Sequence, residues 1–408
     1  MNNLATTEKR ISLLLIASAC LLMLLSFGFR SSFGLFVRPI TEANEWGREV
    51  ISISLAIQNL VWGIAAVFAG GLADRFGNVK VVVGGTVFYA IGLACMAGVD
   101  SPWLLHTSTG LFVGAGVAGT SFGIVLPAMA RAVGEERRDW ALGLGTATGS
   151  LGQFVMVPIS QTLISSYGWV MALYALAGLA LLMAVLAIPL APYSGRNEVV
   201  DELRDQRIGE ALAEAFQHRS FVLLVFGFFV CGFHVAFVTA HLPAYLADAG
   251  FPPEIGAWCI AIVGIFNIFG AYGAGVLAGR FSKRYLLVSI YAARAVVITA
   301  FLLTPLSLAS VFVFSAAMGI LWLSTVPATS GLVAVMFGTR YMALLYGMVF
   351  LGHQIGGFLG VWLGGWAFDR LGSYDLVWWL GVGLGLFAGI VHWPIREQAV
   401  PRLAAQQI

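Results

Sequence analysis

One arginine stands deep in an apolar segment of this chain. Arg30 lies deep in the first apolar run, where an arginine in a membrane costs on the order of 3 kcal/mol on insertion scales. Every Asp and Glu lies instead in a loop, at the end of a run, or in a terminal or linker segment. A buried cation without a protein anion favours an anionic ligand, and a carboxylate fits the paired donors of a guanidinium. The alternative is that Arg30 extends to the outer interface near Arg38.

Other polar residues inside the apolar runs recur at matching places in the two halves of the chain. Gly28-Phe29-Arg30 matches Gly232-Phe233-His234, and Leu151-Gly152-Gln153 matches Leu351-Gly352-His353. Imidazole donates to a carboxylate when neutral and pairs with it when protonated, so these histidines are candidate ligands and candidate proton carriers. The alternatives are independent packing roles for each residue and a chance match of short triplets.

The chain also carries two copies of one short loop sequence. Residues 70–77, Gly-Gly-Leu-Ala-Asp-Arg-Phe-Gly, recur in eroded form at 275–282, 205 positions later (275 − 70 = 205). Each copy stands between the second and third long apolar runs of its half. A repeat at half the length of an apolar chain is typical of secondary transporters, in which two similar halves enclose a site near the bilayer midplane.

The elements that must position these residues are predicted to be membrane-spanning helices. Hydrophobic residues make up 59% of the chain and charged residues only 10%, against about 25% charged in soluble domains. Apolar runs of about 20 residues predict about twelve spans. We predict an all-α membrane protein with six-helix bundles at 1–192 and 221–408, joined by a cytoplasmic linker at 193–220. Residues 210–216 of that linker read as a short amphipathic helix.

Charge placement predicts the orientation. If the loops are numbered from a cytoplasmic N-terminus, only Arg38, Arg48 and Arg370 among the loop cations fall outside, so both termini are predicted to be cytoplasmic. The formal net charge of +2 argues against a nucleic-acid partner. The four cysteines lie in apolar runs at no metal-ligand spacing, and we interpret them as small core residues. No metal and no cofactor is expected.

Twelve spans in two repeats, a long central loop and Gly-x-Leu-Ala-Asp-Arg-x-Gly after the second span together resemble the major facilitator superfamily. The resemblance covers nearly the whole chain and implies the fold of two six-helix bundles. It also implies a gating role for Asp74 and Arg75, since the acidic residue of this loop helps to hold the bundles together on the cytoplasmic side. The alternative for Asp74 is a helix cap.

Within that superfamily, residues 28–36 resemble the first span of the monocarboxylate transporter and oxalate/formate antiporter branch. The resemblance implies that spans 1, 5, 7 and 11 line the cavity, so Arg30, Gln153, His234 and His353 are predicted to converge on one site, with Gln354 beside His353. The eighth span lacks the arginine common in the branch and shows Asn267 and Tyr272 instead, which we predict as ligands.

Two further residues in the second half are singled out. Trp322 is a candidate for an apolar cavity wall, because Pro327 beyond it marks a bend in the tenth span. Arg294 lies in the ninth span, which the resemblance places away from the cavity. We interpret Arg294 as structural, bonded to backbone carbonyls or to polar groups of a neighbouring helix.

The leading hypothesis is a multi-pass carrier, monomeric in the bacterial inner membrane, that moves a small organic anion, a monocarboxylate, by alternating access, as symport or antiport. A proton is a candidate coupling ion through His234 or His353. The alternatives are a carrier of a neutral or zwitterionic solute, a drug-like exporter, and a receptor that kept the fold. A membrane enzyme is disfavoured, because no nucleophile, metal cluster or acid/base pair stands at depth in the sequence.

Overall fold

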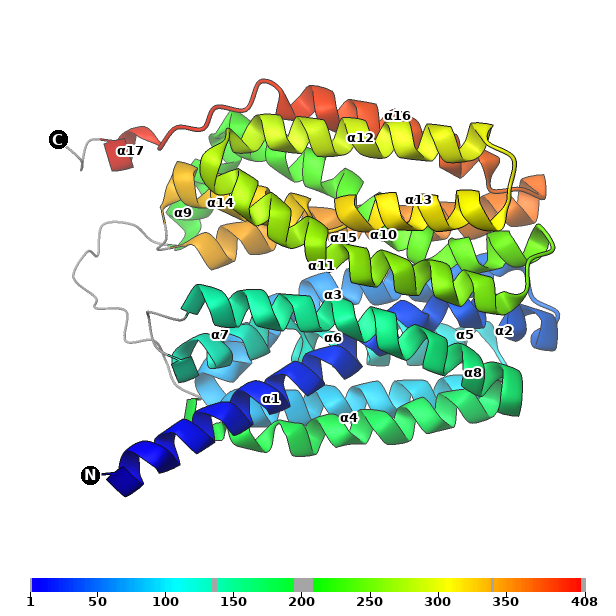
Figure 1. Cartoon of the computed structure of the whole chain (residues 1–408), viewed down its shortest axis with the longest axis horizontal. Coiled ribbons are helices and arrows are strands. Elements are labelled where there is room, and N and C mark those ends of the chain that lie inside the picture. Colours follow the sequence, from blue (N-terminus) through cyan, green and yellow to red (C-terminus); the bar gives the residue numbers. More distant parts are fainter. Residues whose placement is uncertain (1, 134–137, 194–207, 339–340, 405–408) are drawn as a thin grey trace. The chain divides into compact units, whose positions relative to one another are not determined.

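The computed structural model of the chain describes residues 2–133, 138–193, 208–338 and 341–404, and this part is helical without strands. In each half of the chain, Figure 1 shows long helices that lie side by side. In the first half the helices are α1 (Asn2–Ser32), η1 (Phe33–Phe36), α2 (Val37–Asn44), α3 (Arg48–Phe76), α4 (Asn78–Ala97), α5 (Pro102–Leu105), η2 (His106–Val113), α6 (Gly114–Thr120), α7 (Phe122–Val133), α8 (Arg138–Leu186) and η4 (Ile188–Tyr193). In the second half they are α9 (Ile208–Gln217), α10 (Arg219–Asp248), α11 (Pro253–Arg280), α12 (Lys283–Leu303), α13 (Leu308–Leu321), α14 (Thr325–Phe337), α15 (Met342–Leu371), α16 (Asp375–His392) and α17 (Pro401–Ala404).

The long helices have the length and composition of membrane spans. Eleven segments among the described residues are long and apolar enough to cross a bilayer, and one of them, Trp140–Ala191, has 52 residues. Inside that segment Gly168 has φ 79° and ψ 163°, a conformation that breaks the helix. A segment of 52 residues with a break supplies two spans, because one crossing takes about 20 residues. The prediction of about twelve spans is therefore confirmed.

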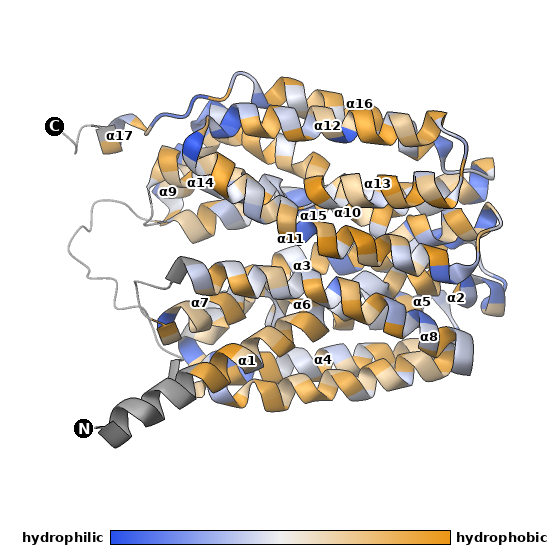
Figure 2. Cartoon of the chain, viewed as in Figure 1, coloured by the Kyte–Doolittle hydropathy of each residue, from blue (hydrophilic) through white to orange (hydrophobic). Residues whose placement is uncertain are grey.

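Hydropathy follows the helices. Figure 2 shows hydrophobic residues along the length of the helices, with most of the hydrophilic residues near the helix ends and connections. This pattern fits a bilayer, where backbone polar groups must be bonded within the helix and charged side chains belong at the ends. The short amphipathic helix predicted at 210–216 is confirmed as α9.

The described contacts divide the chain into two compact units. Unit 1 comprises residues 1–196 and 239–265, and unit 2 comprises residues 197–238 and 266–408. The middle of α10 and of α11 therefore marks the change from one unit to the other. The predicted bundle boundaries at 1–192 and 221–408 stay a prediction.

In unit 1, α1 and α8 meet through glycines that let the backbones approach closely. A Cβ atom on Gly152 would lie 2.1 Å from the carbonyl oxygen of Leu24, and one on Gly28 would lie 2.5 Å from Met156 Cγ. Small residues at such crossings are typical of helix pairs in membranes, where close van der Waals contact replaces the hydrophobic driving force. This contact fixes the rotation of α1, and with it the direction in which Arg30 points.

Residues 239–265 join unit 1 through polar contacts near the ends of the helices. Arg48 Nη1 and Nη2 donate to the two carboxylate oxygens of Asp248 at 2.5 and 2.7 Å. Ser165 Oγ donates to Glu254 Oε1 at 3.0 Å. Two parallel hydrogen bonds between a guanidinium and a carboxylate are a strong, orientation-specific contact.

In unit 2, α10 and α15 pack in the same close way. A Cβ atom on Gly232 would lie 1.7 Å from the carbonyl oxygen of His353, and one on Gly356 would lie 1.9 Å from that of Phe229. Because the glycines alternate along the crossing, the two helices are held at backbone contact over several turns. This contact brings His353 and Gln354 against α10.

Both units contain an interrupted span at the same place in the repeat. In the first half, Ser121 separates α6 from α7 with φ −95° and ψ −176°. In the second half, residues 322–324 separate α13 from α14. Non-helical backbone inside a bilayer persists only where other protein groups bond to it, so each break requires partners from neighbouring helices.

Candidate functional site

Arg30 lies at the end of α1 and is held by α3. Its Nη2 atom donates to Asn59 Oδ1 at 2.8 Å, and its guanidinium lies 4.6 Å from the ring centroid of Trp62. Within the described residues no carboxylate forms an ion pair with Arg30. The side chain remains partly exposed, whereas Asn59 and Trp62 are buried. The guanidinium therefore keeps donors that an incoming anion can use.

Aromatic rings form the wall beside this guanidinium. Phe27 contacts Trp62 with ring centroids 5.9 Å apart and Phe122 with ring centroids 4.2 Å apart. Tyr89 of α4 donates its hydroxyl to the backbone oxygen of Ser26 at 3.1 Å. An apolar wall with a single cation is the arrangement that binds a small molecule with one charged end and an apolar body.

Gln153, the second predicted ligand in unit 1, bonds to the backbone of α11. Its Nε2 atom donates to Ile260 O at 2.8 Å, and the side chain is buried. The structure therefore brings Arg30 and Gln153 into one unit and gives Gln153 a backbone partner of its own. Its role as a ligand stays a prediction.

In unit 2, His353 and Gln354 form a bonded pair on α15. His353 Nδ1 lies 2.9 Å from Gln354 Oε1. An amide oxygen only accepts, so Nδ1 carries the proton and Nε2 is left as an acceptor. The imidazole lies between Phe228 and Phe350, with ring centroids 5.0 and 5.6 Å away. Both side chains are buried.

His234 on α10 is directed to α16. Its Nε2 atom lies 2.8 Å from Gly381 O, to which it donates, while Nδ1 is buried without a hydrogen-bond partner among the described residues. The backbone bond fixes the tautomer, because the carbonyl accepts the Nε2 proton. His234 and His353 thus belong to one unit, with separate partners.

Three other residues that were singled out from the sequence lie at the break between α13 and α14. Asn267 Oδ1 accepts the backbone N–H of Leu323 at 2.9 Å. Arg294 Nη2 donates to Leu321 O at 2.6 Å and also to Trp322 O. Trp322 itself is buried. The interpretation of Arg294 as bonded to backbone carbonyls is confirmed, and Asn267 is placed at the same break.

Three predicted residues are not brought into these clusters. The side chain of Tyr272 is 77% exposed, so it does not join the buried residues of unit 2. Arg75 at the end of α3 is exposed and lies over the ring of Phe76, 5.2 Å from its centroid. Asp74 lies within α3, but its side chain falls outside the described residues.

Two residues of these clusters were missed from the sequence. Asn59 is the hydrogen-bond partner of Arg30, and the signal was available, because Gln58-Asn59 is a polar pair inside the second apolar run. Cys231 was interpreted as a small core residue, yet its Sγ atom lies 3.5 Å from Arg294 Nη2. No sequence pattern linked these two, since 63 positions separate them.

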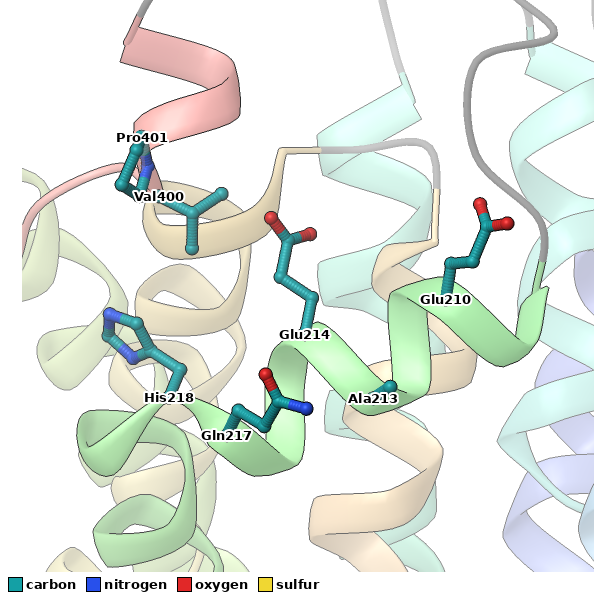
Figure 3. Close-up of a pocket in the computed structure, with 7 residues that line it drawn as sticks. All are labelled: Glu210, Ala213, Glu214, Gln217, His218, Val400 and Pro401. Atoms are coloured by element: carbon teal, nitrogen blue, oxygen red, sulfur yellow. The ribbon is translucent and has the colours of Figure 1, made fainter.

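A surface pocket of unit 2 lies apart from these clusters. It has a volume of about 450 Å³ between α9 and the C-terminal segment, with the lining residues shown in Figure 3. Glu210 and Glu214 line it, so its charge is opposite to that of a site for an anion. Burial lowers the pKa of His218 in its wall below the usual value, although nearby Glu214 acts in the opposite direction. Among the described residues, no group of His, Cys, Asp and Glu could hold a metal ion.

Comparison with known proteins gives one consistent family. The family model of the Major Facilitator Superfamily matches residues 19–349. The chain is 27% identical to an uncharacterised MFS-type transporter, YcxA, of Bacillus subtilis over 86% of both chains. It is 25% identical to rat monocarboxylate transporter 13, covering 88% of this chain and 83% of that protein. It is 27% identical to the multidrug resistance protein MdtH of Cronobacter sakazakii, covering 94% and 95%.

A solved structure agrees in fold. The crystal structure of a D-xylose-proton symporter aligns with a TM-score of 0.76 over 95% of this chain and 99% of that one, at 14% identity. The family match spans most of the chain, and the apolar helices and their repeat agree with it. The chain therefore belongs to the Major Facilitator Superfamily and is a multi-pass membrane transporter of that family.

Proposed function

We propose that this transporter carries a small organic anion, a monocarboxylate, with Arg30 as the primary ligand of the carboxylate. The observation that supports this proposal is that Arg30, partly exposed at the end of α1, has no ion-pair partner among the described residues. A cation in a membrane span costs free energy unless an anion neutralises it. Substrate carboxylate supplies that anion, and Asn59 and Trp62 orient the guanidinium toward it.

The relatives support more than one substrate class. The similarity to monocarboxylate transporter 13 favours a monocarboxylate, whereas the similarity to MdtH favours a drug-like solute. The lone cation against an aromatic wall favours the first, because a neutral or cationic solute would leave Arg30 unneutralised. A carrier of a neutral or zwitterionic solute or a drug-like exporter is the second candidate.

The test is a ligand screen on purified protein with three variants. A ligand that binds only the folded state raises the unfolding temperature by mass action. We expect acetate, lactate or pyruvate to stabilise the wild type, and dicarboxylates, sugars and cationic drugs to do so less. Arg30→Ala should abolish this stabilisation. Arg30→Lys should keep part of it, because the charge remains but the paired donor geometry is lost.

Arg38→Ala is the matched control. Arg38 lies on α2 and forms an exposed ion pair with Glu42, one helical turn after it. Loss of the Arg38 side chain should therefore leave anion binding unchanged. Wild-type stabilisation by carboxylates in Arg30→Ala would contradict the proposal. Stabilisation by a drug or a sugar alone would favour the second candidate.

The gating and coupling roles complete the proposal. Asp74 and Arg75 act as a latch on the cytoplasmic side of a bacterial inner-membrane protein, so Asp74→Asn should change cross-linking across that side while substrate binding persists. His234 and His353 carry the coupling proton, so their joint replacement by Gln should leave anion exchange intact and abolish acid-driven accumulation. Unchanged cross-linking, or full acid-driven accumulation, would contradict the respective role.

A further inference from the structure

A buried cation in unit 2 is left without a carboxylate. Arg294 has no exposed surface, and no described carboxylate forms an ion pair with it. Its Nε and Nη2 atoms donate to Leu321 O, and Nη2 also donates to Trp322 O, while Nη1 is buried without a hydrogen-bond partner among the described residues. Carbonyl dipoles satisfy donors but do not carry a full negative charge. A buried guanidinium in a membrane protein pairs with backbone carbonyls or with another ionisable group, and Arg294 has the first kind of partner without a carboxylate.

Among the described residues, the ionisable acid that is hydrogen-bonded to this guanidinium is a thiol. Cys231 Sγ lies 3.5 Å from Arg294 Nη2 and 3.3 Å from Thr325 Oγ1, two groups that can both donate to sulfur. The same Sγ atom lies 3.9 Å from Trp322 O, a carbonyl to which an S–H group could donate. The site therefore offers partners to both forms, a carbonyl for the thiol and two donors for the thiolate.

The internal repeat supplies a second copy of this junction, in which a phenol stands at the position of the guanidinium. Ser26 on α1, Thr120 on α6 and Tyr89 on α4 each stand 205 positions before Cys231, Thr325 and Arg294. Ser26 Oγ and Thr120 Oγ1 lie 2.8 Å apart, and Tyr89 donates to the backbone oxygen of Ser26. The half with a neutral phenol has a serine, which does not ionise. The half with a guanidinium has a thiol, which does.

We propose that Cys231 and Arg294 form a thiolate–guanidinium ion pair in unit 2, and that Cys231 is a proton-exchanging group of this transporter. When the S–H bond breaks, its electron pair stays on sulfur. The proton passes to Nε2 of His353, the free acceptor of that imidazole, and from there to water. The proposal is independent of the assignment of Arg30, which lies in unit 1.

The groups around the sulfur determine how it responds to pH. From the neighbouring helices, the titratable, charged and hydroxyl groups that face Cys231 are Tyr291 and Arg294 of α12, Thr325 of α14, and Tyr346 and His353 of α15. None of these groups is a carboxylate, so protonation of a neighbouring acid does not compete with protonation of the thiolate. His353 also acts on the sulfur electrostatically.

The direct test is the ultraviolet absorbance of thiolate in protein that keeps one cysteine. Cys20→Ala, Cys95→Ala and Cys259→Ala leave Cys231 alone. A free cysteine is only a few per cent ionised at neutral pH. We expect instead the signal of about one thiolate per molecule at neutral pH. Adding Cys231→Ser should remove this signal. Adding Arg294→Lys should retain it, because the positive charge remains. No Cys231-dependent thiolate at neutral pH would overturn the proposal.

A chain that keeps only Cys20 is the control, and it remains informative if Arg294 variants fail to fold. Cys20 is a half-buried thiol on α1 without a hydrogen bond to an arginine among the described residues. We expect no thiolate there at neutral pH. An equal thiolate signal from Cys20 would overturn the assignment of Arg294 as the cause.

Transport provides the functional readout. Cys231→Ser preserves the hydrogen bond to Thr325 but cannot ionise, so we expect substrate exchange to persist while its dependence on pH flattens across the neutral range. A pH profile identical to that of the wild type would overturn the proton-exchanging role of Cys231 in transport, even with a thiolate present in the purified protein.

Discussion

The partners of Arg30 show how two side chains of α3 set up an anion site. Asn59 accepts from Nη2 and leaves the remaining guanidinium donors free, while Trp62 covers one face of the group. An amide orients the guanidinium without neutralising it, which a carboxylate in the same place would do. The identity of residue 59 therefore decides whether the charge of Arg30 is available to a ligand.

We predict that Asn59→Asp loses anion binding. The new carboxylate would be nearly isosteric with the amide, 2.8 Å from Nη2, and would act as an internal counter-ion. Carboxylate affinity should fall at least about tenfold, which corresponds to ~1.4 kcal/mol. The checks are ligand-dependent thermal shifts and transport rates. Asn44→Asp is the control, since its amide bonds only to Ile40 of its own helix, and unchanged affinity in Asn59→Asp would contradict the role given to Arg30.

At the scale of helices, the crossing of α1 and α8 depends on the absence of one side chain. We predict that Gly152→Ala destabilises unit 1 by about 1–3 kcal/mol or more, because the added Cβ would lie 2.1 Å from Leu24 O. Gly143→Ala on the same helix should be neutral or stabilising by up to about 1 kcal/mol, since nothing lies within 4 Å of its Cβ position. Unfolding in detergent compares the two variants, and equal effects would argue against close packing at Gly152.

The start of α12 is capped by a residue from the far end of the chain. Glu397 accepts from the Ser282 hydroxyl and from the backbone N–H of Arg284 at 2.9 Å. Burial by itself would raise the pKa of this carboxyl, but these hydrogen bonds outweigh burial and hold the pKa below its usual value of 4.5. The carboxylate form therefore stabilises the folded state above that usual value, and the stabilisation is lost as the pH falls through the lowered pKa.

We predict that Glu397→Gln lowers the stability by about 1 kcal/mol at neutral pH, in the range of other helix caps. The difference from wild type should shrink as the pH falls below about 4.5, where the wild-type carboxyl also becomes neutral. Unfolding midpoints across this pH range check the prediction. Glu45→Gln, at an exposed turn, serves as the control, and a difference that does not vary with pH would contradict the capping role.

At the scale of the whole molecule, the Arg48–Asp248 pair joins segments that are 200 residues apart. Its side chains are 10% and 29% exposed, so the pair is better shielded than a surface ion pair. We predict a coupling of about 0.5–3 kcal/mol in a double-mutant cycle of Arg48→Ala and Asp248→Ala. The exposed Arg38–Glu42 pair should couple by less than about 0.5 kcal/mol. Equal coupling in both cycles would remove the special role of the Arg48 contact.

The sequence alone predicted the spans, the repeat and the family, because these depend on local composition and on short motifs. Arg30 was found as a candidate ligand for the same reason: its depth within an apolar run and the absence of mid-span carboxylates can be read along the chain. Arg294 was interpreted as bonded to carbonyls or to polar groups of a neighbouring helix because its span is peripheral in the resembled fold, and the structure shows the carbonyls of Leu321 and Trp322 as partners.

Only the tertiary structure decided which side chains meet. A helix can rotate about its axis without changing its composition, and close glycine contacts such as the one at Gly152 fix that rotation. These rotations place Asn59 against Arg30 and Cys231 against Arg294, and they leave Tyr272 exposed. Such pairings depend on how segments far apart in the chain pack together, and no pattern within either segment records them.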